Sequence, residues 1–216
     1  MYRSARTAPI LTWVTDRDAT TGGDAAFDGS SGTMAAREIV VGVSGGVAAY
    51  KAAALVSQLV QADFPVSVVM TRAACKFVGP ATFAALSGRS VATRVFDPAF
   101  PLGAHIELAR RGQLLCVAPA SADLLAKAAH GIADDVLSTL YLSFSGPVIM
   151  APAMNCEMWD KPVVQRNVQR LRDDGVMMVD PEAGWLSCRQ QGQGRMAAPE
   201  KILAAIQQVA ASWPAS

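Results

Sequence analysis

The sequence has no apolar run of transmembrane length, almost no net charge and no closely spaced pair of cysteines. A helix that spans a bilayer needs about 20 consecutive apolar residues, and no stretch reaches that length, so no membrane association is expected. The formal net charge is +1, which indicates neither nucleic acid nor an acidic surface as a partner. Two histidines and four separated cysteines give no zinc-site spacing, so no metal is expected.

What the chain does contain is apolar. Hydrophobic residues make up 51% and charged residues 17%, which favours a large buried surface and is compatible with subunit interfaces. Cys75, Cys116 and Cys156 stand among apolar residues and are interpreted as core or near-core positions. Cys188 differs, because Ser, Arg, Gln and Gly surround it. This use of cysteine predicts a reducing, cytoplasmic location.

Residues 1–36 differ in composition from the rest of the chain. They are rich in Thr, Ala, Gly, Ser and Asp, with no apolar core of a signal peptide and with acidic residues that argue against a transit peptide. We expect a disordered N-terminal extension there and a single domain over residues 37–213. Met34 stands just ahead of the first expected strand and is an alternative start.

From residue 39 onward, short apolar runs alternate with helical patterns. Strands are predicted at 39–43, 65–70, 91–96 (the weakest), 114–118, 147–151 and 176–179. Helices are predicted at 47–61, 80–86, 105–110, from about 122 to a break at Gly131, at 134–144, at 163–173 and from Pro199, with a helical stretch past Cys75 and Phe77. Alternation of this kind predicts an α/β fold, flavodoxin-like or Rossmann-like, with a parallel sheet covered by helices on both faces.

The first turn after a strand has the chemistry of an anion site. Ser44, Gly45 and Gly46 lead into Val47, Ala48 and a helix start, where free N–H groups and the positive end of the helix dipole favour a phosphate. The GxGxxG pattern is absent, and the next strand ends in Thr71 rather than an acidic residue, so a mononucleotide such as FMN fits better than NAD. The alternative is a tight turn whose glycines serve packing alone.

Two further strand ends carry small or polar side chains. Ser121, Ala122, Asp123 and Leu124 follow the fourth expected strand, and the octet Pro-Ala-Met-Asn-Cys-Glu-Met-Trp (152–159) follows the fifth. Ligands bind at the carboxyl ends of strands in open α/β sheets, and an asparagine amide can orient a carboxylate. Taken singly, the first loop is ordinary helix capping, and the Met-Asn pair is a turn followed by packing residues.

A histidine and a glycine-rich segment complete the set of candidates. His105 opens a helix and could act as a general base, although a single histidine is more often a surface or capping residue, as we interpret His130. Residues 184–196 resemble a glycine-hinged flap that could bring Cys188 over a substrate as a proton donor, while Arg189 or Arg195 binds an anion. The alternative is a flexible surface loop with an incidental cysteine.

Together these motifs resemble those of the homo-oligomeric flavin-containing cysteine decarboxylases, and within them the phosphopantothenoylcysteine decarboxylases of coenzyme A biosynthesis. The resemblance covers residues 39–196. Its specific parts are SGGVAAYK (44–51), HIELAR (105–110), APASADLLAK (118–127), PAMNCEMW (152–159) and the Cys188 flap with its GQGRM end. The octet matches the family's substrate-recognition pattern PxMNxxMW without a substitution.

The resemblance implies FMN as cofactor and a role for each matching residue. FMN would be bound by Ser44 to Ala48, Thr71, Ser121 to Leu124, and Ala153. His105 would be the catalytic base, Asn155 the anchor of the cysteinyl carboxylate and Cys188 the acid. Met158, Ser187 and Arg195 are the further candidates for substrate contact. The implied reaction is the oxidative decarboxylation of 4′-phosphopantothenoylcysteine to 4′-phosphopantetheine, in which the flavin supplies hydride transfer.

Two departures from the family pattern affect these expectations. The flap usually reads Ala-Cys-Gly, whereas this chain has Ser187, Cys188 and Arg189, which stiffens the hinge and adds a charge. Bacterial members are often fused to a ligase domain, and we expect that activity on a separate chain. The family also implies homotrimers, or a dodecamer of four trimers, with FMN near a subunit boundary.

Three other functions fit parts of the same sequence. A peptidyl-cysteine decarboxylase of the same fold would stop at a C-terminal enethiol and would not need the acid Cys188. A flavin prenyltransferase of similar fold would leave PxMNxxMW unexplained. A non-catalytic regulatory flavoprotein would not need His105, Asn155 and Cys188 together.

Overall fold

The computed structural model describes residues 38–213, and their core is a five-stranded parallel sheet of order β2-β1-β3-β4-β5. The predictions for residues 1–36, Met34 included, lie outside the described residues. The strands of the sheet are β1 (Glu38–Val43), β2 (Val66–Met70), β3 (Gly112–Ala120), β4 (Val148–Pro152) and β5 (Met177–Met178). This confirms the predicted flavodoxin-like fold class.

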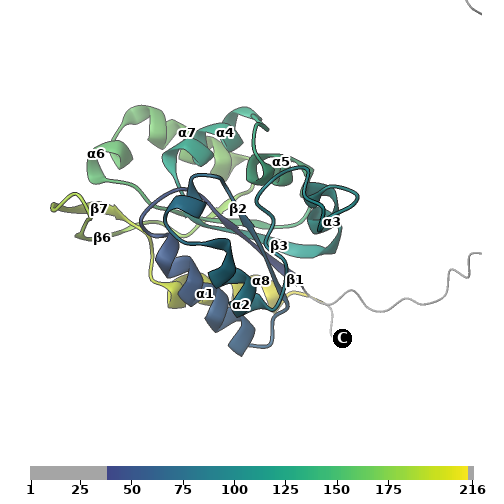
Figure 1. Ribbon diagram of the computed structural model, residues 1–216. Coiled ribbons are helices and arrows are strands. Elements are labelled where there is room, and N and C mark those ends of the chain that lie inside the picture. Colours follow the sequence, from purple (N-terminus) through teal and green to yellow (C-terminus); the bar gives the residue numbers. More distant parts are fainter. Residues whose placement is uncertain (1–37, 214–216) are drawn as a thin grey trace, which may run out of the picture. The chain divides into compact units, whose positions relative to one another are not determined.

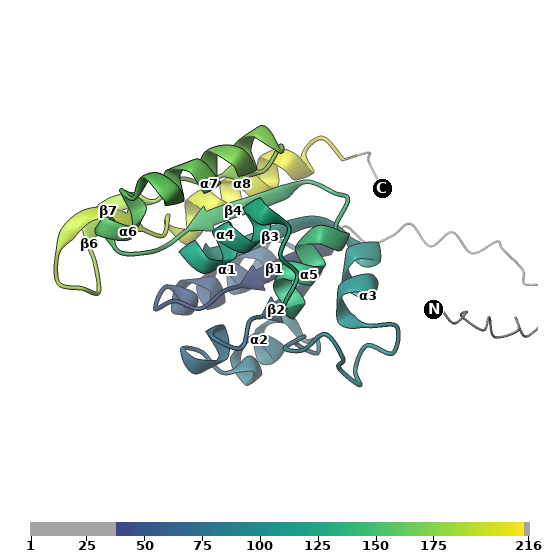
Figure 2. The same ribbon diagram turned by 90° about the horizontal axis from the view of Figure 1, so that it is seen from above.

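Helices cover both faces of the sheet, as Figures 1 and 2 show. One face packs against α1 (Ala49–Gln61), α2 (Pro80–Ser87) and α8 (Pro199–Ala210). The other packs against α3 (Ala104–Arg111), α4 (Ala122–His130), α5 (Val136–Ser143) and α7 (Pro162–Asp173). Successive side chains of a strand point to opposite faces, so Val40 enters one core while Ile39 and Val41 enter the other. A strand buried on both sides must be apolar throughout, which is why β1 reads as a continuous hydrophobic run.

Several elements differ from the predictions. The weak strand predicted at 91–96 is reduced to one bridge between Val69 and Ala92, because the segment leaves the sheet edge at once. The last strand shortens to the two residues of β5. The helical stretch after Thr71 is a 3₁₀ turn, η1 (Ala74–Lys76), and the octet contains a short helix, α6 (Cys156–Trp159).

The predicted flap is an antiparallel hairpin outside the main sheet. It is formed by β6 (Glu182–Trp185) and β7 (Gln191–Arg195), and it lies beside α6 (Figure 1). In β7 polar side chains alternate with glycine, and β6 has one glycine among four residues. Most side chains of both strands are exposed or half-buried, so the hairpin has no hydrophobic face of its own. The hairpin is therefore kept in place by hydrogen bonds and a few contacts with the rest of the chain.

The strand order determines where a ligand can bind. From β1 the chain runs to β2 on one side and then returns to β3 on the other, so the connections diverge between β1 and β3. In open α/β sheets a crevice forms at this point, at the carboxyl ends of the strands. Among residues 38–213, no helix is long and apolar enough to cross a membrane.

Candidate active site

A cavity of 1320 Å³ opens at the carboxyl ends of the first four strands. Its wall includes one short segment from the end of each strand: 44–48 after β1, 71–73 after β2, 121–123 after β3 and 153–155 after β4. We call these four segments the strand-end rim. The cavity therefore lies where the topology predicts a ligand.

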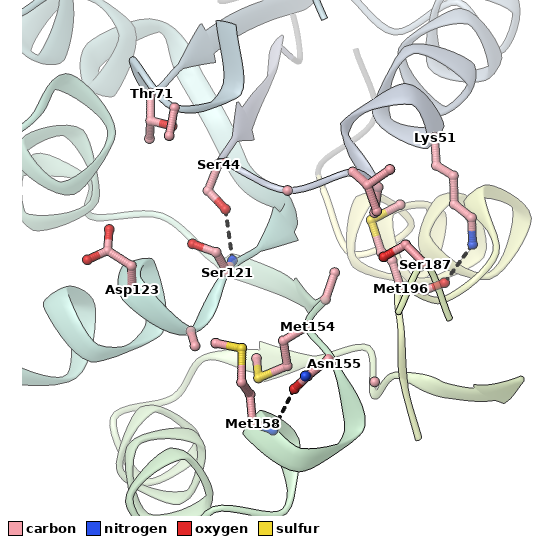
Figure 3. Close-up of a pocket in the computed structure, with 18 of the residues that line it drawn as sticks. Ser44, Lys51, Thr71, Ser121, Asp123, Met154, Asn155, Met158, Ser187 and Met196 are labelled. Atoms are coloured by element: carbon pink, nitrogen blue, oxygen red, sulfur yellow. Dashed lines mark hydrogen bonds between the residues drawn. The ribbon is translucent and has the colours of Figure 1, made fainter. Parts of the chain in front are cut away.

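Ser44 joins two segments of the rim. Its hydroxyl donates to the Pro119 carbonyl oxygen at 2.7 Å. It also accepts from the Ser121 N–H at 2.8 Å, as Figure 3 shows. The side chain is almost fully buried, so no water can replace these bonds. Ser44 thus fixes the ends of β1 and β3 against each other, at the point where the connections diverge.

The turn after Ser44 presents backbone donors to the cavity. Within the described part of the chain, the N–H groups of residues 45–48 have no protein acceptor, and they precede the first turn of α1. Free N–H groups at a helix N-terminus form a site for an anion such as a phosphate. Gly45 is required there because a Cβ atom would overlap that of Ala73, whereas a Cβ on Gly46 would meet nothing.

Thr71 and Ser121 line the same cavity from the two flanking loops. Thr71 Oγ1 accepts from the Ala74 N–H at 3.2 Å, which leaves its O–H free to donate. Ser121 caps α4 by accepting from the Leu124 N–H at 3.3 Å. Leu124 itself was expected to bind the cofactor, but its side chain is buried in the core, it does not line the cavity, and its N–H is already used.

A cluster of charged side chains beside the rim was not predicted from the sequence. Lys127 Nζ lies 3.1 Å from Asp123, 3.0 Å from Asp134 and 3.4 Å from Asp135. Burial alone would lower the pKa of Lys127, but hydrogen bonds to Asp134 and Asp123 outweigh it and raise the pKa. The same hydrogen bond lowers the pKa of Asp134. In the sequence, only the four-residue spacing of Asp123 and Lys127 indicated an ion pair here, and the same spacing is typical of a solvent-exposed helix face.

Asn155 is held in one orientation by the helix that it caps. Its Oδ1 accepts from the Met158 N–H at 2.8 Å (Figure 3). The amide Nδ2 is left as a donor in a side chain that lines the cavity, beside Met154 and Met158. A donor pair suits a carboxylate. Trp159, the last residue of the octet, is instead buried in the core.

The hairpin supplies the remaining wall. Trp185, Ser187 and Arg195 line the cavity, while Cys188 sits on the exposed turn and does not. Lys51 ties the end of the hairpin to α1, because its Nζ donates to the Met196 carbonyl oxygen at 3.0 Å (Figure 3). Burial, followed by the charge of Arg195, lowers the pKa of Lys51.

His105 lies away from this cavity, near the start of α3. Its Nδ1 is buried and finds no hydrogen-bond partner among the described residues. One copy of the chain therefore gathers the rim residues and Asn155 but does not bring His105 and Cys188 to them. Of the other predicted site residues, those that line the cavity are Ser44, Gly45, Gly46, Val47, Ala48, Thr71, Ser121, Ala122, Asp123, Ala153, Met158, Ser187 and Arg195.

Further cavity residues had not been predicted as site residues. They are Tyr50, Lys51, Arg72, Ala73, Lys76, Lys127, Asp135, Met154, Trp185, Leu186, Gly194 and Met196. Several are cations, so the cavity wall is more basic than the net charge of the chain indicates. Among the described residues, no cluster of His, Cys, Asp and Glu could hold a metal ion.

Comparison with known proteins gives three kinds of match. The model of a family described as Flavoprotein matches residues 29–211. The "Coenzyme A biosynthesis bifunctional protein CoaBC" of Bacillus subtilis is 47% identical over 168 residues, which are 77% of this chain and 41% of that protein. The chain thus spans about two fifths of the length of this relative.

Two solved structures share the fold. A mutant PPC decarboxylase in complex with pantothenoylaminoethenethiol has a TM-score of 0.72 and 27% identity, over 81% of this chain and 98% of its own. The FMN-dependent cysteine decarboxylase SpaF has a TM-score of 0.70 and 35% identity, over 82% of this chain and 98% of its own. The Bacillus relative is named as bifunctional, so in that protein two activities share one chain, unlike the separate ligase chain that we expected here.

Proposed function

The chain belongs to the Flavoprotein family, and from that premise we propose that it is an FMN-dependent decarboxylase that converts 4′-phosphopantothenoylcysteine to 4′-phosphopantetheine. One observation carries the proposal: a single cavity joins an anion-binding turn to the amide of Asn155. The relatedness to proteins of coenzyme A biosynthesis supports this choice of substrate. A cytoplasmic location stays a prediction.

The residues at the rim fit FMN. Free N–H groups of residues 45–48 suit its phosphate, and the Thr71 hydroxyl suits the phosphate or ribityl chain. The volume of 1320 Å³ accommodates a mononucleotide together with a substrate. FMN, when bound, would supply the hydride transfer of the reaction.

The chain's own residues would bind and orient the substrate. Asn155 would hold the cysteinyl carboxylate through its amide donors, since its oxygen is already used by the α6 cap. Cys188 would supply the proton that completes the thiol product, after a movement of the hairpin turn brings it into the cavity. Arg195 and Ser187, both in the cavity wall, would contact the substrate.

His105 would act in the cavity of a second copy of the chain. Exposed apolar residues precede and follow it in the chain, with Phe96 89%, Leu102 61% and Ile106 37% accessible. Exposed apolar side chains near one another in the chain are typical of an interaction surface. We therefore propose a homotrimer, or a dodecamer of trimers, in which His105 enters the site of a neighbouring copy as the base.

A mixing experiment tests this arrangement. His105→Asn should be inactive and Asn155→Ser should keep at most about a tenth of the parent kcat/KM. A co-refolded mixture should be more active than either variant alone, because some sites combine two intact halves. His130→Asn serves as the control, because that exposed histidine faces no part of the cavity. A mixture no more active than the two separate variants would refute a site shared between two copies of the chain.

A peptidyl-cysteine decarboxylase is the second candidate, and the position of Cys188 outside the cavity wall favours it. The two activities differ at Cys188, which only the coenzyme A reaction needs. Purified protein should be yellow and should release carbon dioxide from 4′-phosphopantothenoylcysteine under anaerobic conditions, faster than from a cysteine-terminated peptide. Colourless protein that takes up no FMN would refute both candidates.

The variant Cys188→Ser gives the sharpest product test. Without the acid, the reaction should stop at the enethiol, which is lighter than the thiol product by two hydrogen atoms and is visible by mass spectrometry. Cys75→Ser is the matched control and should release the normal product. If Cys188→Ser still releases the normal thiol product, Cys188 is not the acid of the reaction.

A further inference from the structure

Two cysteine thiols lie around one side-chain oxygen at the flap turn. Cys156 Sγ donates to Gln190 Oε1 at 3.5 Å, and Cys188 Sγ lies 4.0 Å from the same atom. The two sulfurs are therefore no farther apart than these two distances combined. Cys156 begins α6 and Cys188 lies on the turn of the hairpin, so the fold brings together residues that are distant in the chain.

The hairpin is docked beside Cys156 through β7. A Cβ atom on Gly192 would lie 2.7 Å from Cys156 Cβ and 3.1 Å from its Sγ, so only glycine allows this close approach. The Met154 N–H donates to the Gly194 carbonyl oxygen at 2.9 Å. The strands thus stay against α6, while residues 187–190 of the turn are all exposed. A movement confined to the turn can bring the second sulfur to the first.

The other two cysteines are poorly suited to exchange. Attack on a disulfide requires the thiolate form. Complete burial raises the pKa of Cys116 to about 12, and partial burial raises that of Cys75. Cys156 is half-buried and Cys188 is exposed, so both sulfurs are accessible to a small reagent.

We propose that Cys156 and Cys188 form a reversible disulfide that switches the enzyme off, an inference whose effect on turnover rests on the proposed function. The oxidant is a low-molecular-weight disulfide. The Cys188 thiolate attacks one of its sulfurs and releases one thiolate, and the Cys156 thiolate then attacks Cys188 sulfur and releases the second. The two protein protons end on the two released thiols, so the protein is oxidised by two electrons and the small disulfide is reduced.

The bond would remove the proposed acid and fix the turn at the same time. A disulfide needs Cβ atoms about 3.5–4.5 Å apart, so the Gln190 side chain must swing out from between the sulfurs. The turn would then be tied to the residue that follows Asn155. In a reducing compartment such a bond forms only under oxidation, as expected for a switch rather than a structural crosslink.

Glutathione redox buffers test the proposal on the full FMN-loaded chain. After equilibration with excess oxidised glutathione, digestion should yield one peptide pair linked through Cys156 and Cys188, without added glutathione. Decarboxylation should fall at least tenfold and recover with dithiothreitol. Cys75→Ser should behave like the parent chain. Cys156→Ser should keep the basal activity, yield no linked pair and carry glutathione on Cys188 instead.

Each other outcome counts against the switch. Glutathione on Cys188 with Cys156 free in the parent chain would overturn it, and so would a linkage between two chains on a non-reducing gel. A linked pair with unchanged turnover would overturn the regulatory role. If untreated protein does not decarboxylate the substrate, the proposed function fails, whereas the mass of the linked peptides still decides whether the disulfide forms.

Discussion

The two sides of the cavity are held by different means. The strand-end rim is held by buried hydrogen bonds between loops that end parallel strands, with Ser44 as their common member. The hairpin is held by a few bonds at its base, from Lys51 to Met196, from Met154 to Gly194 and from Lys201 to Glu182. Segments with few buried contacts open at lower free energy. The rim is thus suited to hold a cofactor in place and the hairpin to admit and release a substrate.

The largest effect is expected at the rim, from Ser44→Ala. The change leaves the Ser121 N–H without its acceptor, whereas the Pro119 carbonyl oxygen keeps the Ser44 N–H at 3.2 Å, and it should lower the free energy of unfolding by about 1–3 kcal/mol. Urea unfolding measures this. Ser143→Ala removes an exposed hydroxyl and should cost less than about 0.5 kcal/mol. Equal losses in the two variants would show that the rim is no more rigid than the surface.

Asn155 lies where the rim meets the hairpin, and Asn155→Ser should affect substrate binding without affecting the stability of the fold. Serine also caps helices, so α6 should form and stability should change by less than about 0.5 kcal/mol. The lost bond to a charged carboxylate should lower kcat/KM roughly 10–100-fold. Asn155→Ala, which removes the cap as well, is the comparison variant. A stable Asn155→Ser protein with full activity would refute the anchor role.

Arg189→Gly concerns the hairpin turn alone. Arg189 has φ 63°, a conformation that costs a side-chain-bearing residue about 1 kcal/mol and suits glycine. Glycine should stabilise the turn by about 0.5–1 kcal/mol. Hydrogen exchange should then slow at the amide of Leu186 and at the amide of position 189, because both donate hydrogen bonds within the turn. Asp63→Gly relieves a similar φ of 62° elsewhere and should leave these amides unchanged.

The smallest effect is expected from Lys201→Met at the base of the hairpin. The Lys201 hydrogen bond lowers the pKa of Glu182, so this pair stabilises the fold above the pKa of an unfolded glutamate, about 4.3, and the effect is lost as pH falls through the lower folded value. For so exposed a lysine the loss should be below about 0.5 kcal/mol at neutral pH. Parent and variant should converge in acid, and a gap that persists there would exclude the ion pair as its cause.

The sequence predicted the sheet well because each buried strand is a continuous apolar run ended by a small-residue turn. The rim followed from the same logic, since strand ends of a parallel sheet meet at one edge. The hairpin strands were not predicted, because Glu182–Trp185 and Gln191–Arg195 are short, polar and glycine-rich, without hydrophobic alternation.

Side-chain placement was less accessible to sequence reasoning. Leu124 was grouped with its loop neighbours, although the α4 turn directs it into the core. Lys127 reads as a surface residue until α4 and the start of α5 bring three carboxylates to it. The position of His105 away from the cavity depends on how α3 packs, which no local pattern specifies.

Gly45 and Ala73, which lie in the loops after β1 and β2, compete for the space of one methyl group. A methyl group fits at only one of the two positions, so the size of one residue limits the size of the other, although the two belong to different βα units. Ala73→Gly should therefore rescue Gly45→Ala, and a double-mutant cycle should return a coupling of about 1 kcal/mol or more. Across related chains, the residues at these two positions are expected to vary together.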